Sequence, residues 1–159
     1  MTKELIQAYT ARITQASKTE LVVITYEILL SDIKEAQTAF EIGDNSQYSK
    51  VLKHASTVIN ELMRSLDYQY EISYNLMSLY IYASKCLIEA NYQKNIGLLE
   101  NAAIVIQKLM AGFEEICSQD MSGPVMQNAQ QLYAGLTYGK GTLNEVYIDP
   151  QEHNRGFKA

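Results

Sequence analysis

Hydrophobic and polar positions alternate with the period of an α-helix through nearly all of residues 1–122. Five amphipathic stretches are separated by short polar segments, and each presents apolar residues at spacings of three and four. The first covers residues 3–14, the second runs from Ser17 to Gly43, and the others begin near residues 45, 71 and 95. Seams of this kind pack helices at about 20° to one another, and short connections make successive helices antiparallel. The pattern predicts an all-α fold, an antiparallel up-and-down four-helix bundle with a short extra N-terminal helix.

The second helix begins and ends at recognisable signals. Ser17 and Glu20 have the spacing of a capping box, in which the serine hydroxyl accepts from the Glu20 amide and the glutamate reaches back to the Ser17 amide. Gly43 suits the position just after a helix, because glycine adopts a positive φ without strain. We therefore expect this helix to be well bounded at both ends.

The second helix is also apolar on two sides. A broad stripe suited to the core consists of Val22, Tyr26, Leu29, Ile33, Ala36 and Phe40. A shorter stripe on roughly the opposite side consists of Leu21, Ile24 and Ile28. Such a helix is either central in the fold or offers one face to a partner. Two interpretations remain open: residues 3–14 fold over the short stripe, or a partner covers it.

The fourth helix is predicted to face the core with one seam, made of Ile72, Leu76, Leu79, Ala83, Cys86 and Ala90. It belongs to a region unusually rich in tyrosine: the chain has 12 Tyr and no Trp, and six of the tyrosines lie between residues 68 and 92. One interpretation is that these rings lie half-buried with their hydroxyls exposed to solvent. The other is that they form a contact surface, since tyrosine gives a large contact area at low entropic cost. The sequence leaves both interpretations open.

The last forty residues differ in character from the rest. Both prolines and five of the eight glycines lie after residue 122. We therefore divide the chain into a helical bundle, residues 1–119, and an irregular C-terminal extension, residues 120–159. Within the extension, residues 124–134 allow one more helix with Pro124 in its first turn, and residues 142–148 have a loosely extended pattern. We expect the bundle to fold without this tail.

Charge and composition narrow the function. The chain has 159 residues, the length of one domain, and a net charge of −5. An acidic chain is a poor ligand for nucleic acid or an anionic membrane. No run reaches the roughly 18 apolar residues of a membrane span, and the N-terminus lacks the apolar segment of a signal peptide. We therefore expect a cytoplasmic protein without membrane insertion.

Candidate catalytic and metal-binding residues are few. The two histidines, His54 and His153, have no Glu-x-x-His pattern around them, and we interpret both as solvated surface residues. Cys86 falls on the predicted core seam of the fourth helix and Cys117 ends the fifth helix, so we interpret both as reduced structural thiols that pack as small hydrophobic residues. The sequence therefore predicts no catalytic residue, no metal site and no cofactor.

Two groups of short motifs point to a family. The first group is Ala8-Tyr9, Ala16-Ser17-Lys18-Thr19-Glu20-Leu21 and Tyr26-Glu27. The second group is Ile59-Asn60-Glu61-Leu62, Ser65-Leu66-Asp67, Glu71-Ile72-Ser73, Asn75-Leu76, Leu79-Tyr80 and Leu87-Ile88-Glu89-Ala90-Asn91. In these motifs the chain resembles the FliS family of flagellin export chaperones over residues 8–116. It departs from the family pattern at Lys18, Glu27, Ile28 and Phe113, where the family has proline, aspartate, glycine and tryptophan.

The resemblance implies a cytosolic chaperone that binds the disordered C-terminal segment of flagellin, prevents premature polymerisation and passes the subunit to the flagellar export gate. It implies no enzymatic activity and either a monomer or a homodimer. With the apolar stripes it suggests these partner-binding residues: Tyr9, Ile13, Leu21, Ile24, Tyr26, Ile72, Asn75, Leu76, Leu79, Tyr80 and Tyr82. The competing function classes are a helical adaptor or signalling bundle with another amphipathic partner, and an enzyme or phosphotransfer module, against which the lack of ligand sets speaks.

Overall fold

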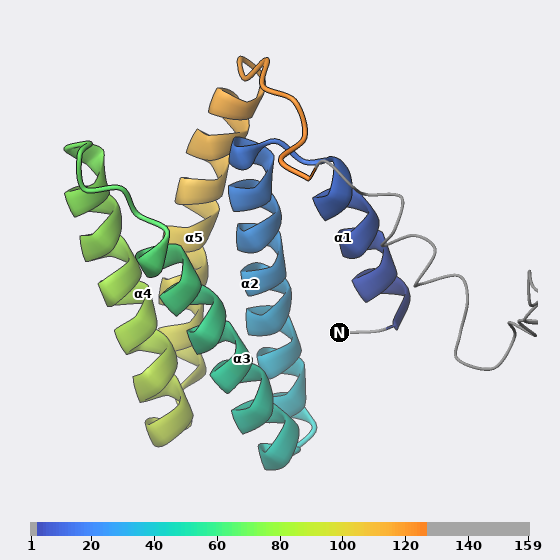
Figure 1. Cartoon of the computed structure of the whole chain (residues 1–159). Helices are drawn as coiled ribbons and strands as arrows, with labels where there is room; N and C mark the ends of the chain where they lie inside the picture. The colour runs from blue at the N-terminus through green and yellow to red at the C-terminus, as the bar shows by residue number, and fades with distance from the viewer. Residues whose placement is uncertain (1–2, 127–159) are drawn as a thin grey trace, which may run out of the picture. The chain divides into compact units, whose positions relative to one another are not determined.

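The all-α class is confirmed. The computed structural model describes residues 3–126, and these contain five helices and no strand (Figure 1). The helices are α1 (Lys3–Gln15), α2 (Lys18–Glu41), α3 (Asn45–Arg64), α4 (Ile72–Gln93) and α5 (Ile96–Cys117). The starts of all five helices, and the ends of α1 and α2, agree with the predicted positions to within a residue or two.

The described residues belong to one compact unit. The helix expected over residues 124–134 falls mostly outside the described residues, and residues 124–126 are not helical. The extended segment expected at residues 142–148 also lies outside them. The domain boundary placed after residue 119 stays a prediction.

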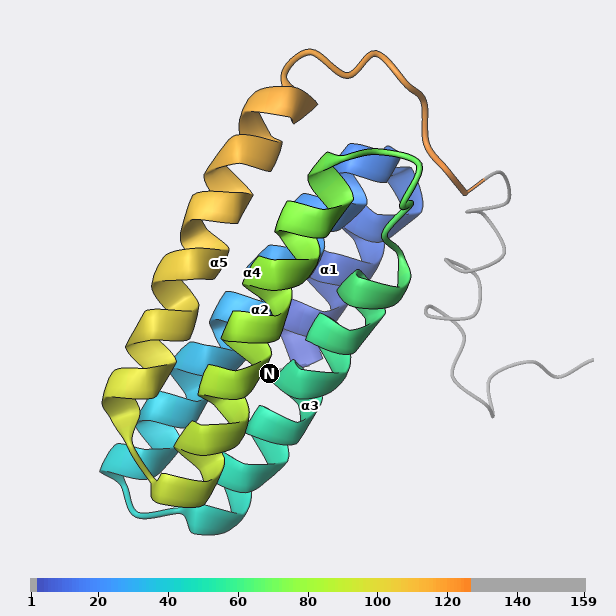
Figure 2. The same cartoon turned by 90° about the vertical axis from the view of Figure 1, so that its left-hand side faces the viewer.

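The four long helices pack in a closed ring. α2 contacts α3 and α5, and α4 contacts the same two helices from the opposite side of the core. Figures 1 and 2 show α2 to α5 lying side by side along their lengths, with α1 beside α2. Because α1 packs against α2 outside the ring, the bundle core is complete without it.

The predicted capping signals are present. The Ser17 hydroxyl accepts from the Glu20 amide at 3.2 Å, and the Glu20 carboxylate accepts from the Ser17 amide at 2.8 Å. Gly43 follows α2 with a φ of 75° and donates its N–H to the Phe40 carbonyl. The helix borders are thus fixed by bonds within a few residues of each border.

The core lies inside the ring of four helices. α2 contributes its broad stripe, with Tyr26, Leu29, Ile33 and Ala36 fully buried. Val22 is partly buried against the core, while Phe40 lies at its edge, with its ring 5.7 Å from that of Tyr48. The broad stripe therefore faces the core as its spacing predicts.

The seam predicted for α4 is partly wrong. Ala83, Cys86 and Ala90 are buried as predicted, but Ile72 and Leu79 are exposed, and Ser73, Tyr80 and Leu87 are buried in their place. The buried face is thus shifted by about one residue from the predicted seam. The cause is Tyr80: because its hydroxyl finds a buried partner, the larger aromatic ring takes the core position that hydropathy alone assigns to leucine.

That partner is the hydroxyl of Tyr26 on the opposite helix α2. The two hydroxyl oxygens are 2.5 Å apart, and both side chains are buried. Phe113 of α5 packs edge-on against the Tyr26 ring, with centroids 5.6 Å apart. Burial raises the pKa of both phenols, so they remain neutral at physiological pH. No buried side-chain nitrogen or oxygen in the described part of the chain lacks a hydrogen-bond partner.

Among the described helices, α5 alone is long and apolar enough to cross a membrane by length and composition, with a mean hydropathy of 1.3. The sequence analysis looked for an uninterrupted apolar run and did not identify this helix, because Glu100 and Lys108 interrupt the run. These two charged residues do not lower the average hydropathy of the helix below that of a membrane span. Leu99, Ala102 and Ile106 of α5 are buried in the bundle. A core helix meets the same criterion, so this feature is weak evidence for a membrane segment.

The Tyr26–Tyr80 pair can be tested with a double-mutant cycle. Tyr26→Phe leaves the Tyr80 hydroxyl buried without a partner, so we expect a loss of about 1–3 kcal/mol in the free energy of unfolding. The double variant Tyr26→Phe/Tyr80→Phe should lose clearly less than the sum of the single variants, since no orphan hydroxyl remains. Chemical denaturation measures each value.

Tyr92→Phe is the matched control, because Tyr92 is 89% exposed. It should change stability by less than about 0.5 kcal/mol. Additive effects of the two core substitutions would contradict a coupled pair.

Candidate partner-binding surface

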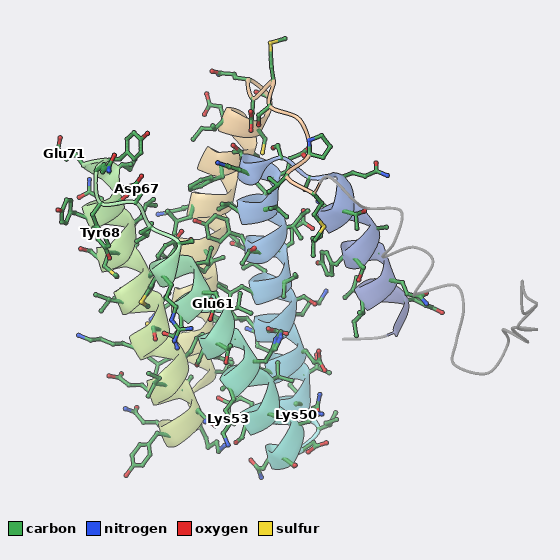
Figure 3. All side chains as sticks on the ribbon, viewed as in Figure 1. Lys50, Lys53, Glu61, Asp67, Tyr68 and Glu71 are labelled. Atoms are coloured by element: carbon green, nitrogen blue, oxygen red, sulfur yellow. The ribbon has the colours of Figure 1, made fainter. Side chains whose placement is uncertain are left out.

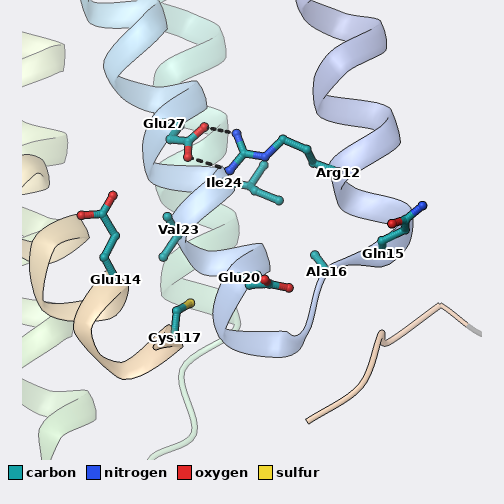
Figure 4. Close-up of a pocket in the computed structure, with 9 residues that line it drawn as sticks. All are labelled: Arg12, Gln15, Ala16, Glu20, Val23, Ile24, Glu27, Glu114 and Cys117. Carbon is teal, nitrogen blue, oxygen red and sulfur yellow. Dashed lines mark hydrogen bonds and ion pairs between the residues drawn. The ribbon is translucent and has the colours of Figure 1, made fainter. Parts of the chain in front are cut away.

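α1 is held on α2 by few contacts. It folds back along α2, and the Arg12 guanidinium forms a two-pronged ion pair with the Glu27 carboxylate, one contact being 2.8 Å long (Figure 4). Of the α1 side chains that the structure describes, residues 4–15, only Thr14 is buried, and Ile6 is half exposed. A helix of 13 residues is marginal on its own in water. α1 therefore depends on a limited docking surface for its stability.

The short stripe of α2 lies beneath α1. Ile24 is only 3% exposed, yet it is not part of the core inside the ring. Leu21 and Ile28 are partly buried. Of the two interpretations of this stripe, the structure shows the first: the N-terminal helix folds over it.

The contact between α1 and α2 is incompletely filled. A cavity of about 470 Å³ lies at the end where α1 meets α2 and α5 (Figure 4). Its floor is apolar, with Val23 and Ile24, and its rim carries the charged groups of Arg12 and Glu27. The remaining lining residues are Gln15, Ala16, Glu20, Glu114 and Cys117. An apolar floor with a polar rim is the arrangement of a protein-binding groove.

A second hollow, of about 300 Å³, lies between Ile6 of α1 and the helices α2 and α3. It contains a buried acid: Asp32 is 2% exposed, and its carboxylate oxygen lies 2.6 Å from Nδ1 of His54. Burial raises the pKa of Asp32, while the hydrogen bond and the charge of His54 act in the opposite direction. His54 is half exposed, but the interpretation as a purely solvated histidine is wrong, because its ring nitrogen is bonded to Asp32.

The structure places the sequence-predicted binding residues in three separate locations. Tyr9 and Ile13 are partly buried residues of α1, and Leu21 and Ile24 belong to the short stripe of α2, against which α1 packs. Tyr26 and Tyr80 lie in the core, so a partner reaches them only if the bundle opens. The remaining residues belong to α4: Ile72, Asn75, Leu79 and Tyr82 are exposed, and Leu76 is partly buried.

The tyrosines between residues 68 and 92 differ in burial. Tyr80 is a core residue, whereas Tyr74, Tyr82 and Tyr92 are exposed. Tyr68 projects from the α3–α4 connection between Asp67 and Glu71 (Figure 3), and its ring lies 5.5 Å from that of Tyr74. Most of this cluster is therefore an aromatic outer surface rather than a part of the core.

The sequence analysis did not identify two polar pairs of this region, Arg12 with Glu27 and Asp32 with His54. The signal for Asp32 was present: the short stripe Leu21, Ile24, Ile28 continues at helical spacing to Asp32 and then Glu35. No local sequence pattern indicates that Arg12 pairs with Glu27, because the pair forms only when α1 folds back along α2.

No group of three or more His, Cys, Asp or Glu side chains that could hold a metal ion occurs in the described residues. Both cysteines are free thiols, and burial raises the pKa of Cys117. What the surface offers is apolar area with charged edges, which suits docking of another chain.

Comparison with known proteins gives a family match. The family model described as flagellar protein FliS matches residues 1–120. These residues include all five helices and the α1–α2 contact. No curated protein matches the chain.

The buried acid gives a test by pH. Because folded Asp32 holds its proton more tightly than unfolded Asp, stability from this group is lost as pH rises from the ordinary value of 3.8 through the raised folded pKa. The unfolding free energy of the wild type minus that of Asp32→Asn should therefore fall over this range. We expect a fall of about 1.4 kcal/mol for each unit by which the pKa is raised.

His54→Gln is the companion variant, since it removes the neighbour that stabilises the carboxylate. In that background the fall should be steeper. If the unfolding free energy of the wild type minus that of Asp32→Asn instead grows with pH, the pair with His54, and not burial, dominates the ionisation of Asp32. Thermal and urea unfolding at a series of pH values provide both curves.

Proposed function

Because the chain belongs to the FliS family of flagellar export chaperones, we propose that it binds the disordered C-terminal segment of flagellin and keeps it from polymerising prematurely. In this proposal it then hands the subunit to the flagellar type III export apparatus. The observation that carries the proposal is the short apolar stripe of α2, which lies outside the core and is covered by a helix with few contacts of its own.

The physical basis is an exchange of helices. An amphipathic segment can lay its apolar face on the α2 stripe once α1 has moved away, which is helix-in-groove recognition. Ordering a disordered segment costs about 2–5 kcal/mol and requires burial of roughly 1,000–3,000 Å². The short stripe alone is too small for that area. We therefore infer a long, wrapping contact that also uses the exposed apolar residues of α4, such as Ile72, Leu79 and Tyr82.

The proposal also covers the topology of the bundle, the location of the protein and its activity. The four long helices form an antiparallel up-and-down bundle, and the chain acts in the bacterial cytosol as a monomer or homodimer, without enzymatic activity, cofactor or nucleic acid. α5 is part of the bundle rather than a membrane segment. Tyr26 and Tyr80 support the binding surface from within the core, and the other predicted binding residues contact the partner directly.

The experiment that tests the proposal is calorimetry with a flagellin C-terminal peptide at low and at high salt. Apolar burial predicts a negative heat-capacity change and an affinity that changes less than about a hundredfold up to 1 M salt, where screening acts over about 3 Å. A larger loss of affinity would show that the acidic bundle attracts a basic peptide by charge. If the peptide does not bind, the alternative of an adaptor for another amphipathic partner takes the place of this proposal.

A pair of aspartate substitutions on α2 separates the short stripe from the core. Ile24→Asp should keep a cooperative melt within a few degrees of the wild type, because water and displacement of α1 can relieve the new charge, and it should lose most of its affinity for the peptide. Ile33→Asp places a charge in the core. Burying it costs several kcal/mol out of a total stability of about 5–15 kcal/mol, so this variant should unfold.

Circular dichroism melts and the same calorimetry compare the two variants. If they melt alike, the two faces of α2 are not distinct. The binding surface then lies elsewhere, in the first place on the outer face of α4.

A further inference from the structure

The segment that follows α5 returns to the junction between α1 and α2. Residues 118–126, here called the strap, leave the end of α5 and cross to the connection that joins α1 to α2 (Figure 1). The Val125 amide donates a hydrogen bond to the Ala16 carbonyl at 3.1 Å. Residues more than a hundred positions apart in sequence are thus joined at the point where α1 would have to hinge.

A second contact of the strap is made by Asp120. One of its carboxylate oxygens accepts a hydrogen bond from the Ser17 hydroxyl at 3.0 Å, and the other accepts from the Ser122 amide at 2.9 Å. Hydrogen bonds from Ser122 and Thr19 hold the pKa of Asp120 well below its usual range, so the group is ionised at neutral pH. Its negative charge lies at the N-terminus of α2, where the helix dipole favours an anion.

The strap thereby bonds the residue that caps α2. The Ser17 hydroxyl accepts from the Glu20 amide and donates to Asp120, so the cap and the strap share one side chain. The junction residues Ala16 and Ser17 are 3% and 5% exposed, whereas most of α1 is exposed or only partly buried. The firmest point of the N-terminal segment is therefore its hinge, and two bonds from the strap end there.

We propose that the strap is a lock on the α1–α2 junction, which sets how readily α1 leaves the short stripe of α2. Swinging α1 away changes the backbone at Ala16 and Ser17, and this change breaks the bonds to Val125 and Asp120. The strap thus stabilises the covered state relative to the open one. The half of this inference that concerns a partner rests on the proposed function, whereas the lock itself does not.

Loss of the lock has a defined consequence for binding. When the binding-competent state is a minor population, the apparent affinity scales with that population. Weakening the strap raises the open fraction, so it accelerates amide exchange in α1 and increases the affinity for a partner that needs the stripe by the same factor. The loss of one hydrogen bond of ordinary strength corresponds to a factor of about 3–10.

The experiment uses the full-length chain with two single substitutions in the strap. Val125→Pro removes the amide that bonds to Ala16, and Asp120→Ala removes the acceptor of Ser17. Met121→Ala is the matched control, because Met121 lies in the strap but is fully exposed. Hydrogen exchange followed by mass spectrometry is measured without a partner, and calorimetry with the flagellin C-terminal peptide is measured in parallel.

We expect each strap substitution to accelerate exchange about 3- to 10-fold in residues 4–15, to leave α3, α4 and α5 unchanged, and to raise peptide affinity by a similar factor. Unchanged exchange in residues 4–15 would overturn the lock. Faster exchange throughout the bundle would also overturn it, since the strap would then be a support of the whole fold. Should exchange in α1 respond while the affinity falls, the link from lock to binding is wrong.

The two proposals fail in distinguishable ways. If no variant, including the wild type, binds the peptide, the proposed function fails and the exchange data still decide whether the strap locks the junction.

Discussion

The structure depends on one constraint: α2 has to bury two apolar faces at once. Its broad stripe builds the core with α3, α4 and α5, and this face carries the fully buried Tyr26, Leu29 and Ile33. The opposite stripe around Ile24 cannot reach that core, so it needs a separate cover, and α1 provides it. A protein with a complete core plus an extra apolar stripe is suited to exchanging what lies on the stripe.

The two faces of α2 are covered in physically different ways. In the core the apolar side chains are buried, and the hydroxyls of Tyr26 and Tyr80 satisfy each other. Under α1 the packing leaves hollows on both flanks, and the contacts that bridge it are polar: Arg12 with Glu27 is a partly exposed ion pair, worth at most about 1 kcal/mol. The first arrangement resists opening, whereas the second opens at low cost.

The polar groups of the described residues mainly join one part of the fold to another. The polar side chains that the structure gathers, such as Asp32 with His54 and Asp120 with Ser17, bond one helix or segment to another and satisfy each other. No cluster of side chains that could hold a metal ion occurs among the described residues. What remains unsatisfied on the surface is apolar area, on the α2 stripe when uncovered and on the outer face of α4.

The sequence by itself determined the class of fold, the starts of the five helices, the cap at Ser17 and the two faces of α2. These features depend on residues three or four positions apart, and such spacings can be read along the chain. Only the tertiary structure decided which face of α4 is buried, that Asp32 bonds to His54, and that Asp120 bonds to Ser17. Tyr80, which lies on the buried face of α4, is 54 positions from its partner Tyr26. Asp32 and His54 are 22 positions apart, and Ser17 and Asp120 are 103 positions apart. The local sequence around one residue does not identify a partner so far away in the chain. Its burial and pairing are therefore fixed only when the helices meet.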